Sequence, residues 1–97
     1  MTYTIRWKGC TKSDAVASHL EEKIGKFEDF KFVMPDVKAE IVFYDKQQSF
    51  TTRLNVQVKG KGILNAEGRA NDVLTSINLA TDKILDRLRR VKTRYEK

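Results

Sequence analysis

The chain has 97 residues, of which 40% are apolar and 33% are charged, and its formal net charge at neutral pH is +6. This length and balance predict one globular domain over residues 1–97 and exclude a disordered chain. One histidine and one cysteine exclude multi-histidine and cysteine-cluster metal sites, and no apolar run approaches the roughly 18 residues of a membrane span.

The first predicted strand has one apolar face, because apolar residues alternate with polar neighbours there: Tyr3, Ile5 and Trp7. Ser13 is the expected N-cap of a helix over residues 14–28, with Asp14 in the first turn, where a negative charge favours the helix dipole. Apolar residues recur along this helix at helical spacing: Val16, Leu20, Ile24 and Phe27. Gly25 weakens its last turn by about 1 kcal/mol relative to alanine.

Three further strands are predicted in the middle of the chain. Residues 28–36 contain the only proline, Pro35, and are expected to form a connection. The second strand has alternating apolar residues: Val37, Ala39, Ile41 and Phe43. A polar turn over residues 45–49 precedes the clearest period-two pattern, whose apolar side consists of Phe50, Thr52, Leu54, Val56 and Val58. This pattern predicts a sheet with one face on the core and one in solvent, followed by a short strand over about residues 63–67.

The last predicted element is a helix of roughly twenty residues, capped by Asn71 or Asp72. Its apolar positions step by three or four residues: Val73, Ile77, Ala80, Ile84, Leu88 and Val91. The order β-α-β-β-β-α predicts an α+β fold with a four-stranded mixed sheet and both helices packed on one face, as in a double-stranded RNA-binding domain. A right-handed crossover makes the first two strands parallel, and antiparallel hairpins join the later ones.

No arrangement of reactive side chains predicts catalysis. For His19 and Cys10, a surface histidine and a small buried thiol are favoured about tenfold over a nucleophile pair. The turn at Gly60 and Gly62 lacks the spacing and the following helix of a phosphate-binding loop. We therefore expect no enzymatic activity, no cofactor, no metal and no small-molecule substrate. The single cysteine cannot form an internal disulfide, which favours a reducing cytoplasm.

The net charge is concentrated in the last fifteen residues of the chain. Residues 1–82 hold twelve Lys/Arg against eleven Asp/Glu, whereas residues 83–97 hold seven against two. Four of these cations lie within about a quarter of a helix circumference and are called the basic stripe: Lys83, Arg87, Arg90 and Arg94. The helix dipole accounts only for cations in the last turn, and arginine suits bidentate phosphate contacts. Phosphate binding is therefore favoured about two to one over plain solvation, and RNA is the first partner expected.

Other cations carry weaker signals. Lys23 and Lys26 lie among acidic residues, and on their own they are favoured about four to one as ordinary surface lysines. Arg53 on the open sheet face is ambiguous, and Tyr44 is a candidate for stacking on bases. For two other aromatic residues we expect core packing: Tyr3 and Trp7.

The chain resembles the ribosome hibernation-promoting factor and ribosome-associated inhibitor family, also called the sigma-54 modulation protein family, over nearly its whole length. Four segments match the family's motifs in order: residues 5–16, 22–28 (EKIGKFE), 66–78 and 83–92 (KILDRLRRVK). The chain departs from the family pattern at a few positions: Trp7, Cys10, Leu74, Asn78, Asp86 and Arg87. It therefore resembles a divergent short form, or the isolated N-terminal domain of a long form.

This resemblance implies binding to rRNA of the small ribosomal subunit in the bacterial cytoplasm, in the channel that tRNA and mRNA occupy. Translation would be blocked and ribosomes would hibernate under stress, with dimerisation only if a longer form adds a C-terminal domain. The resemblance also implies RNA contacts by Lys23 and Lys26 beside the basic stripe. The candidate RNA-binding residues are Lys23, Lys26, Lys83, Arg87, Arg89, Arg90, Lys92 and Arg94. Two alternatives stay open: a general duplex-RNA-binding domain, and a protein-interaction module that modulates the transcription machinery.

Overall fold

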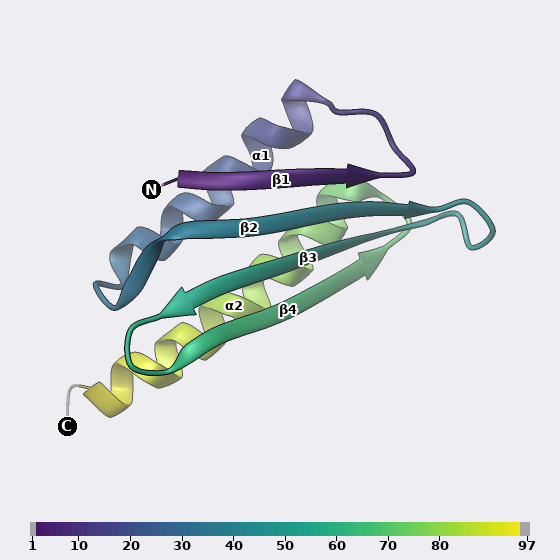
Figure 1. The fold of residues 1–97 in the computed structure, drawn as a ribbon. Helices are drawn as coiled ribbons and strands as arrows, with labels where there is room; N and C mark the ends of the chain where they lie inside the picture. Colours follow the sequence, from purple (N-terminus) through teal and green to yellow (C-terminus); the bar gives the residue numbers. More distant parts are fainter. Residues whose placement is uncertain (1, 96–97) are drawn as a thin grey trace.

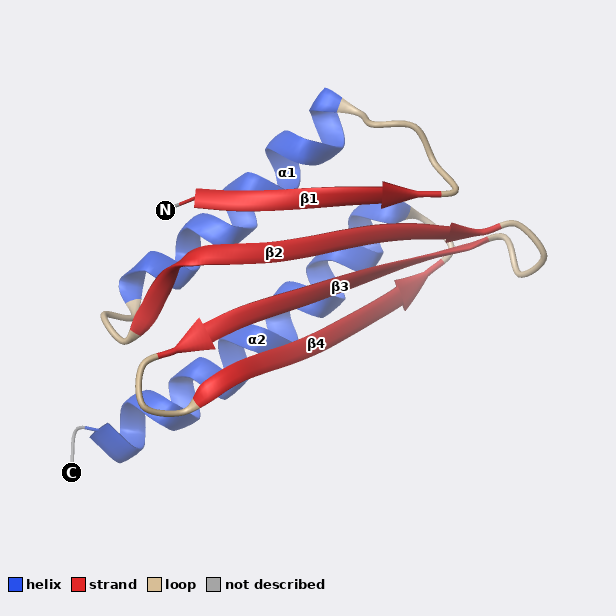
Figure 2. Cartoon of the chain, in the orientation of Figure 1, coloured by secondary structure: helices blue, strands red, loops and turns tan. Residues whose placement is uncertain are grey.

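Four strands form one mixed sheet, and two helices cover one of its faces (Figures 1 and 2). In chain order the elements are β1 (Thr2–Lys8), α1 (Asp14–Gly25), the 3₁₀ turn η1 (Lys26–Asp29), β2 (Val33–Tyr44), β3 (Ser49–Val58), β4 (Gly62–Ala70) and α2 (Val73–Tyr95). The computed structural model describes residues 2–95, and it describes only the backbone of Arg94 and Tyr95. No helix in this range is both long and apolar enough to cross a membrane.

The sheet has the strand order β1-β2-β3-β4, so β1 and β4 are its two edges. β1 pairs with β2 in parallel, while the β2–β3 and β3–β4 pairs are antiparallel. The predicted β-α-β-β-β-α order, the mixed sheet and the shared face of the two helices are therefore confirmed (Figure 1).

The core lies between the sheet and the two helices. Its largest fully buried side chains come from both layers: Leu20, Ile24, Phe27, Ile41, Leu54, Ile77, Ile84 and Leu88. Burying an aliphatic or aromatic side chain of this size contributes about 1.5–3 kcal/mol. Three half-buried residues of β1 pack against this core, as expected: Tyr3, Ile5 and Trp7.

Element boundaries differ from the prediction at three places. α1 ends at Gly25, where glycine weakens the α-helix, and η1 continues the chain so that Phe27 still reaches the core. β2 begins before Pro35, because the β2–β3 register shifts there and a bulge needs no amide from the proline. β4 continues to Ala70, since it pairs with almost the full length of β3.

α2 lies unusually close to β4 at Gly68. A side-chain carbon built at Gly68 would be 2.2 Å from the carbonyl oxygen of Ser76 and 2.5 Å from the amide nitrogen of Ala80. Beside this point the Thr52 and Ser76 hydroxyls share a buried hydrogen bond of 2.8 Å. The glycine therefore fixes the distance at which the backbone of α2 rests on the sheet.

Asp72, one of the two predicted N-cap residues, caps α2. Its Oδ1 accepts a hydrogen bond from the Thr75 amide at 3.0 Å, and its Oδ2 accepts another from the Thr75 hydroxyl. These two bonds, the hydroxyl bond first, lower the pKa of Asp72. A lowered folded-state pKa means that ionised Asp72 stabilises the fold above the ordinary aspartate pKa, and that this stabilisation is lost as the pH falls through the folded-state value.

We expect Asp72→Ala to lower the melting temperature at neutral pH, whereas Asp72→Asn keeps most of the stability, because asparagine also caps helices. The melting-temperature difference between the wild-type protein and Asp72→Asn should shrink in acid. Thermal unfolding followed by circular dichroism over a pH series checks this. Equal melting temperatures for the wild-type and alanine proteins at neutral pH would contradict the capping role.

Candidate nucleic-acid interface

The two helices lie side by side on the sheet and run in the same direction (Figure 1). α1 and η1 follow one another directly and together form the first helical segment. Helical spacing puts His19 and Lys23 of α1 and Lys26 of η1 on one side of this segment. That side faces α2, because His19 Nε2 lies 2.9 Å from Asn78 Oδ1. The parallel arrangement brings the C-terminal ends of both helices to the same end of the molecule, where their dipoles favour cations.

A groove opens between η1 and α2 near this end and is called the helix groove. It is lined by three cations, two carboxylates and two apolar side chains: Lys26, Asp29, Phe30, Asp82, Leu85, Arg89 and Lys92. Leu85 is buried and Phe30 is half-buried, whereas the three cations are exposed. The groove thus combines apolar surface with a surplus of positive charge, which suits a phosphate-bearing partner.

Arg89 also forms an ion pair with Asp86 on the outer side of α2, at 3.3 Å. Both side chains are about two-thirds exposed, at 65% and 66%. Exposed pairs of this kind are worth at most about 1 kcal/mol and are screened by salt. Arg89 can therefore exchange this weak ion pair with Asp86 for a contact with a phosphate.

The basic stripe lies on the opposite flank of α2, along β4. Lys83 Nζ donates a hydrogen bond of 2.6 Å to the carbonyl oxygen of Glu67, and Arg87 Nη1 donates another to the carbonyl oxygen of Asn65. Arg90 is exposed on the same line of the helix. The side chain of Arg94, the fourth member, lies outside the described residues.

The candidate residues are therefore divided between two flanks of α2. Lys26, Arg89 and Lys92 meet at the helix groove, and Lys23 shares their side of the first helical segment. Lys83 and Arg87 face β4 instead, so the structure does not place the two lysines of the first helical segment beside the basic stripe. Sequence spacing defines the stripe, but only helix docking shows which cations lie opposite Lys26.

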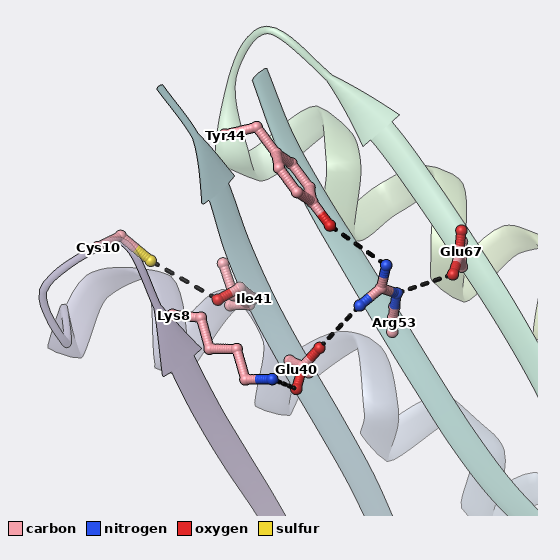
Figure 3. A network of polar contacts seen from close by, with 7 residues as sticks. All are labelled: Lys8, Cys10, Glu40, Ile41, Tyr44, Arg53 and Glu67. Atoms are coloured by element: carbon pink, nitrogen blue, oxygen red, sulfur yellow. Dashed lines mark hydrogen bonds and ion pairs between the residues drawn. The ribbon is translucent and has the colours of Figure 1, made fainter. Parts of the chain in front are cut away.

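The uncovered sheet face carries a polar network centred on Arg53 (Figure 3). Arg53 Nε donates to Glu67 Oε1 at 2.8 Å, Nη1 to Glu40 Oε1 at 3.0 Å, and Nη2 to Tyr44 Oη at 3.2 Å. Glu40 Oε2 also pairs with Lys8 Nζ at 3.3 Å. Arg53 is thus matched by two carboxylates, which makes it a poor phosphate ligand.

The charges in this network hold one another in their ionised forms. Hydrogen bonds to Glu67 and then Glu40 raise the pKa of Arg53. Partial burial raises the pKa of Glu40, but the hydrogen bonds and charges of Lys8 and Arg53 outweigh it and leave the pKa lowered. The strand register continues the network into a row of alternating charge across all four strands: Arg6, Glu40, Arg53 and Glu67.

Several residues of these sites carried no signal in the sequence. The carboxylates that match Arg53 could be found only from the β2–β3–β4 register, and Asp29 and Phe30 join the groove only through the η1 turn. Cys10 has a structural contact, because its thiol lies 3.7 Å from the carbonyl oxygen of Ile41, the acceptor of its hydrogen bond (Figure 3). Within residues 2–95 no group of three or more His, Cys, Asp or Glu side chains is placed to hold a metal ion.

The fold and the helix groove define a small α+β domain with one uncovered sheet face, crossed by a row of alternating charge, and a cationic groove on its helical side. A sequence profile of the family described as "Sigma 54 modulation protein / S30EA ribosomal protein" matches residues 3–96. The chain belongs to this family, as its sequence motifs predicted.

A curated relative agrees with this assignment, and two solved structures share the fold. The chain is 30% identical over 96 residues to the "Ribosome hibernation promotion factor" of Staphylococcus aureus (strain COL), covering 98% of this chain and 50% of that protein. It therefore spans about half the length of this curated relative. The N-terminal domain of Protein Y from Thermus thermophilus has the same fold, with a TM-score of 0.81 at 16% identity, covering 94% of this chain and 99% of that domain. A structure described as a ribosomal subunit interface protein from Coxiella burnetii matches with a TM-score of 0.76 at 16% identity, covering 95% and 99% of the two chains.

Proposed function

We propose that residues 1–97 act as a single ribosome-binding domain that contacts rRNA of the small subunit through its helical side. The observation that carries this proposal is the helix groove, where Lys26 faces Arg89 and Lys92 in a chain of this family. The name of the Staphylococcus aureus relative, a ribosome hibernation promotion factor, supports a ribosomal partner. Such a partner would place the chain in the cytoplasm.

The proposed mechanism is occupancy without chemistry. Phosphate contacts supply the affinity, and the folded body fills the channel between head and body that tRNA and mRNA otherwise occupy. Translation stops and the idle ribosome is preserved under stress. No bond is made or broken, so the mechanism needs no catalytic residue and no cofactor.

The eight candidate residues have different parts in this proposal. Lys26, Arg89 and Lys92 make the main phosphate contacts, because they converge on one groove. Lys83 and Arg87 each donate one hydrogen bond to a carbonyl oxygen of β4. Both retain further donors, since an ammonium group has three N–H donors and a guanidinium group has five. The remaining candidates extend the contact at its margins: Lys23, Arg90 and Arg94.

Co-sedimentation with purified small subunits over a salt series tests the proposal. The logarithm of the association constant falls with the logarithm of the salt concentration, by about 0.7–0.9 for each phosphate neutralised. Three groove cations therefore predict a slope of about −2 to −3, and a broader contact makes it steeper. Binding that is absent, or that does not change with salt, would contradict a phosphate interface.

Two further measurements separate the alternative functions. Duplex RNA that competes as well as small subunits would favour a general duplex-RNA-binding domain, which recognises shape. A partner that survives nuclease treatment of a pulldown would favour a protein-interaction module. We expect duplex RNA to compete poorly and the bound material to be lost on nuclease treatment.

A further inference from the structure

The edge strand β4 is a potential site of self-association. Within residues 2–95 it is paired on one side only, with β3. Every second residue of an antiparallel edge strand points its N–H and C=O groups away from its neighbour. Asn65 and Glu67 are two residues apart, and side chains of α2 contact both carbonyl oxygens, which identifies them as outward-pointing residues. Such groups form a template for pairing with another strand.

Lys83 and Arg87 occupy the two outward acceptors. The fit follows from element geometry, because four residues of helix rise by about 6 Å and two residues of strand by nearly 7 Å. Lys83 therefore reaches Glu67 while Arg87 reaches Asn65, with α2 running opposite to β4. Both cations are fixed on a strand edge, where charged side chains discourage strand pairing.

We propose that Lys83 and Arg87 guard the β4 edge and prevent it from pairing with the β4 strand of a second copy of this chain. Two effects act together. The side chains fill the acceptors that the second strand would need, and a symmetric pair would bring four cations to one seam. This role is separate from phosphate binding and stands whether or not the chain binds RNA.

The second copy is the occupant that the edge itself fits. Each copy carries the same outward backbone groups, so a twofold axis can pair two β4 strands antiparallel. In one such register Asn65 of one copy lies opposite Glu67 of the other, so the two β4 strands overlap over their full length and the outward carbonyl oxygens of each copy meet outward amides of its partner. In this proposal Lys83 and Arg87 are therefore what prevents two β4 strands from pairing.

The test compares the wild-type protein with the double variant Lys83→Ala/Arg87→Ala by size-exclusion chromatography with light scattering, over a concentration series without RNA. We expect the double variant to rise from monomer mass to dimer mass as concentration increases. The wild-type protein and a charge-matched control, Lys12→Ala/Lys46→Ala, should stay monomeric. The control removes two exposed lysines that lie outside the helices and strands.

Amide hydrogen exchange then locates the dimer interface. The amides of Asn65 and Glu67 should exchange freely in the monomer and become protected in the dimer. Should the alanine variant fail to fold, the same measurements are made on Lys83→Met/Arg87→Met. Methionine keeps an aliphatic stem and removes the hydrogen-bond donors and the charges. A folded double variant that stays monomeric overturns the proposal. So does a dimer in which these two amides remain unprotected, or a wild-type protein that dimerises equally well.

Discussion

We expect binding to small ribosomal subunits to fall by at least about a thousandfold when Lys26, Arg89 and Lys92 are all replaced by glutamate. The three cations converge on one groove, so a single phosphate segment can contact them together. A hydrogen bond to a charged group contributes about 1.5 kcal/mol or more, and about 1.4 kcal/mol is a tenfold change in affinity. Three lost contacts therefore give about three orders of magnitude, and the new negative charges add repulsion.

The measurement is co-sedimentation at fixed low salt, with circular dichroism to confirm folding. The matched control is Lys12→Glu/Lys46→Glu/Lys61→Glu, which makes the same change in net charge at exposed positions outside the helices and strands. This control should lose far less affinity, because only the long-range attraction is reduced. A folded groove variant that binds like the wild-type protein would refute the groove as the RNA contact.

A further comparison decides between the groove and the basic stripe. Lys83→Glu/Arg87→Glu/Arg90→Glu also removes three cations from α2, but on the β4 flank. We expect a smaller loss of affinity, because these three cations do not line the helix groove. A larger loss than that of the groove variant would make the basic stripe the main contact.

The largest effect on stability is expected at Gly68. In Gly68→Ala the new methyl group would lie 2.2 Å from the Ser76 carbonyl oxygen, 2.5 Å from the Ala80 amide nitrogen and 2.8 Å from Leu79 Cβ. Two of these atoms belong to the backbone of α2, so the helix must move away from the sheet. Overpacking in a core costs about 1–3 kcal/mol and occasionally more. We expect at least about 3 kcal/mol here, because the displaced helix carries much of the core.

Urea denaturation of Gly68→Ala and Gly25→Ala provides a matched test with opposite signs. A side-chain carbon at Gly25 meets nothing within 4 Å, and its φ of −55° suits any helical residue. Alanine there should raise the free energy of unfolding by about 0.5 kcal/mol, since it restricts the unfolded chain. A Gly68→Ala protein as stable as the wild-type protein would show that α2 does not rest on this glycine as described.

Regular periodicity made most of the fold predictable. The three- and four-residue steps of α2 identify its buried side, because helical spacing is fixed, and Ile77, Ile84 and Leu88 are all fully buried. The alternation in β3 predicts its core face for the same reason. The start of β2 was not predictable, because proline usually interrupts a strand and here a register shift accommodates it.

The candidate site was predictable only as a set of cations on helices. Arg87 and Arg89 are two residues apart and lie on different flanks of α2, and the sequence does not state which flank meets the first helix. That choice depends on how α2 docks on β4, which Gly68 controls. The partners of Arg53 likewise depend on strand register, which pairs residues far apart in the chain.

The row of alternating charge across the sheet limits the attraction that its four residues exert on a polyanion. Neighbouring strands lie about 4.8 Å apart, so the fields of Arg6, Glu40, Arg53 and Glu67 largely cancel over a few strand spacings. At a Debye length of about 8 Å, where a partner is first felt, this row therefore adds little to the potential, and the attraction depends on the cations outside it.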